Sequence, residues 1–155
     1  MTSDFIVDIL EIWWESNRER FASVQTLLLN QDNGPENHSR RTQFMKRIVE
    51  FSQKYQLNVR LAYYPPYHSK YNPIERSWAT LENHWNGNLL DEISTVINFA
   101  QTMTWKGQHP TVALMTANYS TGVKLTKKEM LAVENQIQRS SELGKWFIDI
   151  YYNSV

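Results

Sequence analysis

The sequence contains no cysteine, so the chain forms neither a disulfide bond nor a metal site built on thiolates. It also has no net charge, because 16 basic residues balance 16 acidic ones. This balance argues against a large free-standing surface for nucleic acid, although a local basic patch remains compatible with it. No apolar run approaches the roughly 18 residues of a membrane span, and no signal peptide is visible. A cytoplasmic protein is therefore expected.

The length of 155 residues is enough for one domain with a substantial core. Six tryptophans and eight tyrosines are many for this length. Most of them are expected in the core, and some at an interface. The sequence has no internal repeat, and no linker divides it, so residues 1–155 are predicted to form a single domain.

Two apolar runs predict neighbouring strands. Residues 24–31 have the apolar density of a strand buried on both faces, as in parallel sheets, and a second strand is expected at residues 57–64. Between them, an apolar stripe predicts a helix that begins at His38 or Ser39 and ends near Tyr55. Strand, helix and strand within about 40 residues indicate a right-handed βαβ unit with parallel strands. The predicted fold class is α/β.

Capping patterns and periodicity predict the remaining elements. These are a helix from about residue 3 to 20, a helix that begins at Asn72-Pro73, a helix at 91–104, a helix from Thr126 to about Ser140 and a C-terminal strand at 146–152.

Two carboxylates follow the two predicted parallel strands. Asp32 stands directly after the first strand, where Asn33-Gly34-Pro35 turns the chain, and Glu75 lies beyond the end of the second strand. Open α/β sheets place their ligands at the carboxyl ends of such strands. Two carboxylates brought together there suit a hard divalent ion such as Mg²⁺. A pair of ions for phosphoryl transfer needs more carboxylate than two residues supply, so a third acid is expected.

The two acids lie in motifs that resemble a known family. Residues 31–38, Gln-Asp-Asn-Gly-Pro-Glu-Asn-His, are similar to the strand-end motif around the second catalytic aspartate of DDE transposases. Residues 64–78, which include Tyr-Asn-Pro-Ile-Glu-Arg-Ser-Trp, resemble the block that carries the third acid in mariner-like and related insertion-sequence transposases. The whole chain, including residues 81–87 and 103–107, looks like the C-terminal half of the Rhodopirellula-type transposases.

This resemblance implies a ribonuclease H-like catalytic core. It implies that Asp32 is the second and Glu75 the third catalytic metal ligand, with Mg²⁺ or Mn²⁺ as cofactor. The parent enzyme would hydrolyse a phosphodiester at the end of a mobile element and join the freed 3′-hydroxyl to target DNA. Its partner is therefore DNA, both the transposon ends and the target.

The chain departs from the family pattern at its start. The first catalytic acid of such enzymes lies on the first strand of the sheet, which would precede residue 1. The expectation is a truncated, partial ribonuclease H-like core at residues 1–90 that lacks its first three strands, followed by a mainly helical C-terminal extension of the same domain at 91–155. The isolated chain is expected to be an inactive fragment. The alternative is a non-catalytic remnant that dimerises or binds DNA and modulates the full-length transposase.

Loss of the first strand would leave the strand at residues 24–31 with a bare apolar edge. We expect another strand to cover it. The candidates are the same strand of a second chain, which would make a homodimer, or the C-terminal segment at residues 146–152.

Simpler interpretations exist for the candidate residues. Asp32 also suits the start of an Asx turn, and Glu75 the third position of a capping box on Asn72. The basic residues Arg40, Arg41, Lys46 and Arg47 suit either contacts to a DNA backbone or a solvated helix face. The candidate DNA contacts are Arg40, Arg41, His68, Lys70 and Arg76.

The histidines His38, His68 and His84 lack the short spacing of a metal motif. They are therefore expected to be ordinary exposed or hydrogen-bonded histidines rather than metal ligands.

Overall fold

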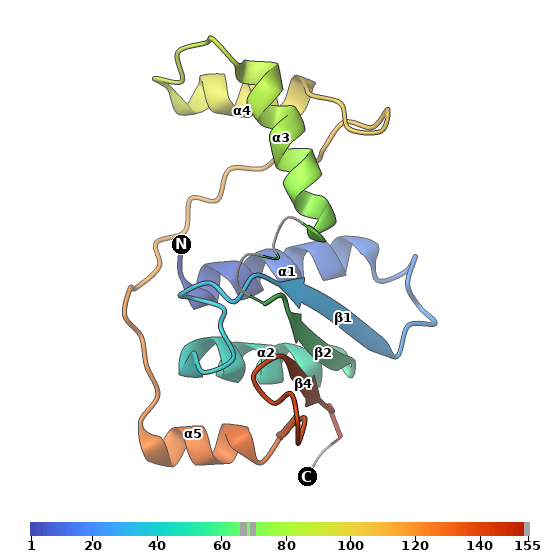
Figure 1. The fold of residues 1–155 in the computed structure, drawn as a ribbon, viewed down its shortest axis with the longest axis vertical. Helices are drawn as coiled ribbons and strands as arrows, with labels where there is room; N and C mark the ends of the chain where they lie inside the picture. The colour runs from blue at the N-terminus through green and yellow to red at the C-terminus, as the bar shows by residue number, and fades with distance from the viewer. Residues whose placement is uncertain (66–67, 69–70, 154–155) are drawn as a thin grey trace. The chain divides into compact units, whose positions relative to one another are not determined.

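The computed structural model describes residues 1–65, 68 and 71–153, which form two compact units (Figure 1). The first unit comprises residues 1–66 and 119–155, and the second comprises residues 67–118. The first contains α1 (Ser3–Asn17), β1 (Thr26–Gln31), α2 (Thr42–Tyr55), β2 (Asn58–Tyr63), α5 (Lys127–Glu134), β3 (Ile137–Arg139) and β4 (Phe147–Ile150). The second contains α3 (Pro73–Trp85) and α4 (Ile93–Thr102). The sequence instead predicts a single domain, divided into a catalytic core at residues 1–90 and an extension at 91–155. The compact units do not test that division, so it stays a prediction.

The sheet of the first unit has the strand order β1-β2-β4-β3. Strands β1 and β2 are parallel and in register from Thr26 opposite Asn58 to Gln31 opposite Tyr63. Helix α2 connects them, so the predicted strand–helix–strand unit with parallel strands is confirmed. The other two pairs are antiparallel, which makes the sheet mixed and the fold α/β.

The C-terminal strand is confirmed at Phe147–Ile150, but it is not the strand that covers the edge of β1, which was one of the two candidate arrangements. Strand β4 pairs instead with β2, with Ile148 opposite Leu61 and Ile150 opposite Val59. All four of these side chains are almost fully buried, so this register extends the core across the sheet. Within the described residues, the outer edge of β1 pairs with no strand.

The C-terminal part is less helical than predicted. Helix α5 begins with the expected capping box between Thr126 and Glu129, but it ends at Glu134 rather than near Ser140. Residues Ile137–Arg139 form β3 instead, because they pair with β4 and so satisfy their backbone groups in a ladder. Most of the chain between α4 and α5 lies outside helices and strands.

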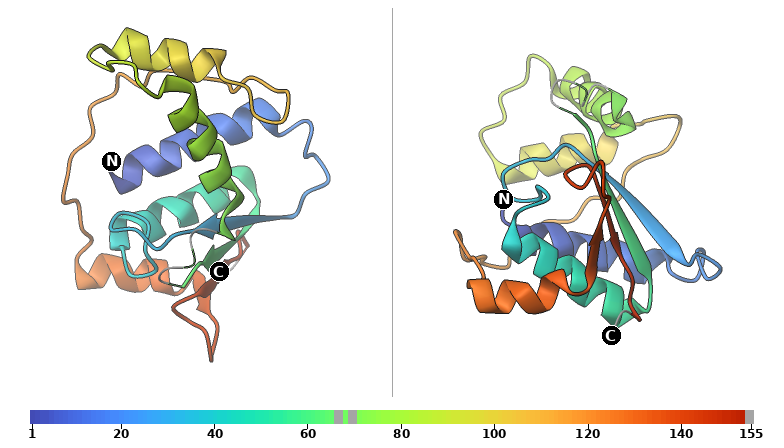
Figure 2. Two further views of the ribbon diagram at one scale, coloured as in Figure 1. Left: turned by 45° about the horizontal axis from the view of Figure 1, so that its top comes forward. Right: turned by 60° about the horizontal axis from the view of Figure 1, so that its bottom comes forward.

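The core of the first unit lies between the sheet and one layer of helices. Helices α1, α2 and α5 lie on the same face of the sheet (Figure 2). The largest fully buried side chains are those of Phe44, Met45, Ile48, Phe51, Leu57, Leu61, Ile148 and Ile150.

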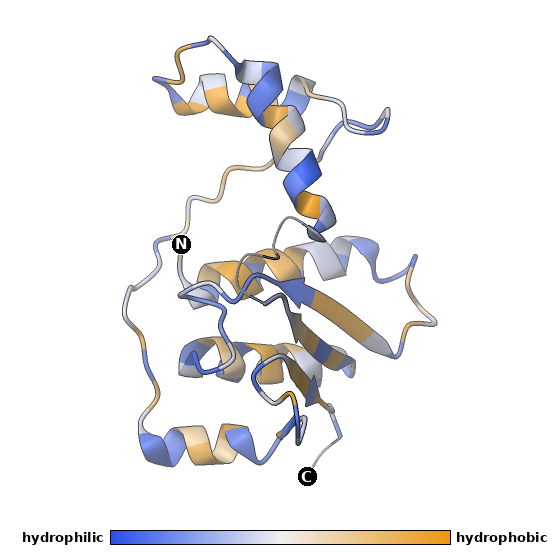
Figure 3. Ribbon diagram, in the orientation of Figure 1, coloured by the Kyte–Doolittle hydropathy of each residue, from blue (hydrophilic) through white to orange (hydrophobic). Residues whose placement is uncertain are grey.

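The composition of strand β1 predicted burial on both faces, and this prediction is wrong. Figure 3 shows its apolar run as an orange band, yet burial alternates along it and Leu28 is 52% exposed. Alternation is the pattern of a strand with helices on one face only.

The second unit is a pair of helices. Asn72 caps α3 as predicted, since its side-chain oxygen accepts the N–H of Ile74 at 3.4 Å. His84 of α3 lies against α4, within 3.0 Å of the Thr102 hydroxyl and edge-on to Phe99. Leu81 and Met103 are buried, whereas Trp78 is exposed. Among the described residues, no helix combines the length and the apolar character needed to cross a membrane.

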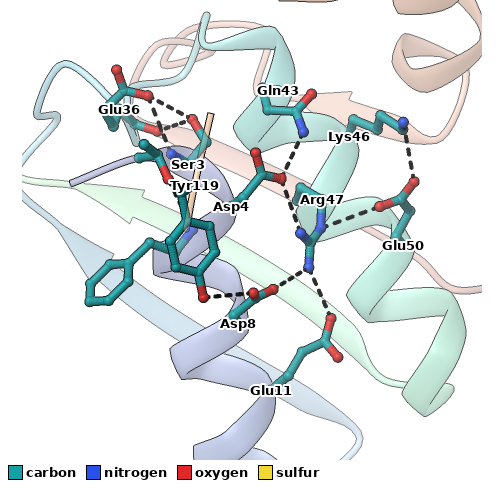
Figure 4. A network of polar contacts seen from close by, with 12 residues as sticks. Ser3, Asp4, Asp8, Glu11, Glu36, Gln43, Lys46, Arg47, Glu50 and Tyr119 are labelled. Carbon is teal, nitrogen blue, oxygen red and sulfur yellow. Dashed lines mark hydrogen bonds and ion pairs between the residues drawn. The ribbon is translucent and has the colours of Figure 1, made fainter. Parts of the chain in front are cut away.

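A network of polar contacts around Arg47 joins α1 to α2 (Figure 4). The guanidinium of Arg47 lies 3.0 Å from Asp4 and 2.7 Å from Asp8, and it also reaches Glu11 at 3.3 Å. These acids lie on one side of α1 because residues three and four apart share a helix face. Burial alone would lower the pKa of Arg47, but the hydrogen bonds to Asp8 and Asp4 raise it above its usual value. Arg47 is therefore neither a solvated residue nor a free cation for DNA.

We predict that Arg47→Met destabilises the protein by about 3 kcal/mol, because several carboxylates of α1 lose a partly buried partner. Lys46→Met is the matched control, since the 3.6 Å pair between Lys46 and Glu50 is exposed and its loss should cost at most about 0.5 kcal/mol. Urea denaturation followed by circular dichroism measures both. Equal losses in the two variants would contradict the assigned role of Arg47.

Candidate functional site

Asp32 follows the last residue of β1 and lies exposed at the carboxyl end of the strand, as predicted. Its Oδ1 atom accepts the N–H of Gly34 at 3.2 Å and the side-chain amide of Asn37, also at 3.2 Å. The Asx turn, which was the alternative interpretation of Asp32, is thus present. It uses only one carboxylate oxygen, and within the described part of the chain Oδ2 accepts no hydrogen bond. Turn formation and metal binding are therefore compatible.

The turn after Asp32 depends on two residues with different roles. Asn33 has a positive φ of 64°, a conformation that asparagine adopts more readily than most residues. Gly34 is needed for space rather than for φ. A Cβ atom at this position would lie 2.9 Å from Oδ1 of Asn37 and 3.4 Å from Oδ1 of Asp32. A larger residue at position 34 would therefore displace the amide that holds the carboxylate.

The segment at residues 32–41, hereafter the Asp32 loop, is fixed to three different elements. The hydroxyl of Ser3 in α1 donates to the carbonyl of Glu36 at 2.8 Å. The hydroxyl of Tyr63 in β2 donates to the carbonyl of Asn37 at 2.9 Å. Arg139 in β3 donates to the carbonyl of Ser39 at 2.9 Å. Burial raises the pKa of Tyr63, so its hydroxyl remains a proton donor at neutral pH.

An ion pair between Glu36 and Arg41 closes the loop. The guanidinium of Arg41 lies 2.9 Å from Oε2 of Glu36, and only 11% of the Arg41 side chain is exposed. Burial alone would raise the pKa of Glu36, but hydrogen bonds from Arg41 and Ser3 outweigh this effect and lower it. Arg41 thus has an internal partner, and its predicted contact with DNA stays a prediction.

The other predicted DNA contacts lie in different surroundings. Arg40 is exposed on the Asp32 loop, and Arg76 is exposed on α3. His68 stacks on Tyr71 at 6.0 Å between ring centroids. Lys70 lies outside the described residues.

Glu75 lies exposed in the first turn of α3. The capping-box interpretation predicts a bond from its carboxylate back to Asn72, as Glu129 makes to Thr126 in α5. No such bond forms among the described residues, where Asn72 caps the helix through Ile74 alone. The carboxylate of Glu75 is therefore open to a ligand.

The chemical type of the candidate ligands, carboxylate oxygens, suits a hard divalent ion. Asp32 and Glu75 each present a carboxylate oxygen without an internal partner in the described structure, and such oxygens are the ligands that Mg²⁺ and Mn²⁺ prefer. Asp32 belongs to the first unit and Glu75 to the second. Among the described residues, no group of three or more His, Cys, Asp or Glu side chains lies close enough to hold an ion by itself.

The histidines have ordinary partners, as the sequence indicated. Nδ1 of His38 accepts the N–H of Arg40 at 3.1 Å, and burial together with Arg41 and Arg40 lowers the His38 pKa. His84 contacts Thr102, and Nδ1 of His109 lies 2.9 Å from the carbonyl of Met103.

Sequence patterns did not place residues 140–146 beside the Asp32 loop, although these residues line the same hollows as Ser39 and Arg40. No local motif marks this connection between β3 and β4. Its position follows only from the pairing of β4 with β2, which brings the start of β4 to the end of β2. This position could have been found only if the pairing of β4 with β2 had been known.

Comparison with known proteins gave one family. The family model described as Rhodopirellula transposase DDE domain matches residues 1–151 of the chain. No curated protein and no solved structure matched.

The lowered pKa of Glu36 predicts how stability responds to acid. A carboxylate with a lowered pKa stabilises the fold above its ordinary value of 4.5, and this contribution is lost as the pH falls further. The free energy of unfolding should therefore fall less steeply below pH 4.5 in Glu36→Gln than in the wild type. The matched control is Glu19→Gln, since Glu19 is exposed and has no ion pair among the described residues. Denaturation across a pH series measures this, and a slope unchanged in Glu36→Gln would contradict it.

Proposed function

Because the chain belongs to the Rhodopirellula transposase DDE domain family, we propose that Asp32 and Glu75 are two of the acids that hold divalent metal ions for DNA transposition. The general activity of such a domain is nucleotidyl transfer on DNA. The finer proposal is hydrolysis of a phosphodiester at the end of the element, followed by joining of the 3′-hydroxyl to target DNA.

The observation that carries this proposal is the position of Asp32. It stands at the carboxyl end of a parallel strand, in a loop held by three other elements, with one carboxylate oxygen open. A ligand for a catalytic ion has to be held in place in this way before the ion arrives. The open carboxylate of Glu75, at the start of a capped helix, supports the second assignment.

The chain's residues supply binding and orientation. When bound, a pair of divalent ions activates the attacking oxygen and stabilises the leaving oxygen of an in-line displacement. Asp32 and Glu75 would hold Mg²⁺ or Mn²⁺ as oxygen ligands, and the bonds from Gly34 and Asn37 would orient the Asp32 carboxylate.

Two acids are fewer than a two-metal site needs. We therefore propose that residues 1–155 alone bind a metal ion without carrying out strand transfer. The parallel pair β1 and β2 with its connecting helix α2 also supports a partial ribonuclease H-like core.

Isothermal titration of Mn²⁺ tests the metal assignment. Asp32→Asn and Glu75→Gln should each weaken binding by about tenfold or more, equivalent to ~1.4 kcal/mol, because each removes a charged ligand. Glu82→Gln removes an exposed acid further along α3 and should bind like the wild type. A wild type that binds no Mn²⁺ at millimolar concentration would leave only the non-catalytic alternative. Loss in one of the two variants but not the other would show that the acids do not converge.

We also propose that the chain forms a homo-oligomer through the edge at residues 24–31. The carbonyls of Gln25 and Gln31 accept bonds from the β2 side, at 3.0 Å from Asn58 and 2.8 Å from Tyr64. Backbone groups alternate along a strand, so those of Thr26, Leu28 and Asn30 point away from β2. An unpaired edge of this kind is a template for another strand.

Light scattering on purified variants tests the shared edge. Leu28→Pro removes an outward N–H and should give monomers, whereas Leu28→Ala keeps that N–H and should remain associated. Circular dichroism confirms that both variants are folded. A monomeric wild type well above micromolar concentration, or equal behaviour of the two variants, would exclude pairing through this edge.

A further inference from the structure

The connection between β3 and β4 reaches the same edge of the sheet as Asp32. Strand β4 runs antiparallel to β2, with Phe147 opposite Ala62, and the N–H of Tyr63 donates to the carbonyl of Trp146 at 2.8 Å. Residues immediately before β4 therefore lie at the carboxyl end of β2. That end is also where the parallel strand β1 leads into Asp32.

This connection is a tight and well-bonded turn. The carbonyl of Leu143 accepts the N–H of Trp146 at 2.7 Å and that of Phe147 at 2.9 Å. The N–H of Leu143 donates to the hydroxyl of Ser140 at 3.1 Å. A Cβ atom on Gly144 would lie 2.7 Å from the carbonyl oxygen of Ser140, so the turn needs glycine there. Lys145 is thus carried by an ordered segment.

Two hollows lie between this turn and the Asp32 loop, with volumes of about 820 and 300 Å³. Ser39, Arg40, Lys145 and Trp146 line both, so the two hollows adjoin along these residues, and together they are called the Arg40–Lys145 groove hereafter. Its smaller part is also lined by Asn33, the residue next to Asp32. Arg139 fixes one wall through its bond to the carbonyl of Ser39.

The groove has unpaired positive charge. Arg40 and Lys145 are exposed, come from segments far apart in sequence, and form no ion pair within the described residues. Arg139, by contrast, is paired with Glu134 at 2.6 Å. Glu142 also lines the groove, so two unpaired cations stand against one unpaired carboxylate.

The remaining lining suits a nucleic-acid strand. Ser140 and Ser141 line the groove, and serine hydroxyls are common donors to phosphate oxygens. Trp146 packs against the core but stays partly exposed and lines both parts of the groove, and aromatic side chains in such positions can stack on bases without regard to sequence.

We propose that the Arg40–Lys145 groove binds the phosphodiester backbone of a DNA strand and leads it to Asp32. Arg40 and Lys145 contact successive phosphates, and the strand continues past Asn33 toward the carboxylate. This inference rests on the proposed function, because it takes Asp32 to be a reacting-site ligand. It adds a substrate-binding wall made by residues 140–146.

Fluorescence anisotropy with a labelled DNA duplex tests the groove. The variant Arg40→Ala/Lys145→Ala should bind at least about tenfold more weakly at low salt, because two phosphate contacts are lost. The slope of log affinity against log salt should fall by about 1.8, which is ~0.9 for each contact. The matched control is Lys127→Ala/Lys128→Ala, which removes the same charge from exposed positions on α5 outside the groove.

The proposal is overturned if the wild type fails to bind DNA at low salt, or if both double variants lose affinity equally.

Mn²⁺ titration of the same variants separates the groove from the metal site. Arg40→Ala/Lys145→Ala should bind Mn²⁺ like the wild type, and Asp32→Asn should bind DNA in the presence of EDTA at least as tightly as the wild type, because it removes a negative charge near the strand. Failed Mn²⁺ binding with a groove-dependent DNA affinity would refute the metal assignment alone. Intact Mn²⁺ binding with DNA affinity independent of Arg40 and Lys145 would refute the groove alone.

Discussion

The structure around the candidate site depends on how the backbone carbonyls of the Asp32 loop are satisfied. Ser3, Tyr63 and Arg139 each donate to a different carbonyl of this loop, and they come from α1, β2 and β3. A loop without secondary structure has no ladder of its own to pair these groups, and a partly buried carbonyl left unpaired is costly. Three elements therefore have to be in place before the loop has one conformation. The orientation of the Asp32 carboxylate is a product of the whole first unit.

The pairing of β4 with β2 has the same kind of consequence. Burial of Ile148 and Ile150 beside Leu61 and Val59 selects the register, because a one-residue shift would turn both isoleucines to the exposed face. That register places Trp146, and with it the neighbouring Lys145, at the carboxyl end of β2. The burial of apolar side chains in the core thus determines which polar residues lie at the same edge of the sheet as Asp32.

Features set by neighbouring residues could be predicted from the sequence. The cap at Asn72, the capping box at Thr126 and the parallel pair β1 and β2 each have a local or periodic signal, and each is present. The partner of β4 could not be predicted, because both β1 and β2 offer apolar edges of similar composition. For Glu75, the sequence was compatible with a capping box as well as with an open carboxylate, and only coordinates distinguish them. The contacts of Arg47 and Arg139 bridge distant segments and leave no trace in local spacing.

Net charge does not show which charged side chains are available to a nucleic acid. The count of 16 basic and 16 acidic residues treats every charge as equally available. In the first unit, Arg41, Arg47, Arg60 and Arg139 are all paired with carboxylates. Such pairs cancel within a few ångströms and contribute little to the field at a distance. What a phosphate backbone meets is the unpaired remainder, and in the described part of the Asp32 edge this remainder includes Arg40 and Lys145. A chain without net charge can therefore present unpaired basic residues on one part of its surface without being basic overall.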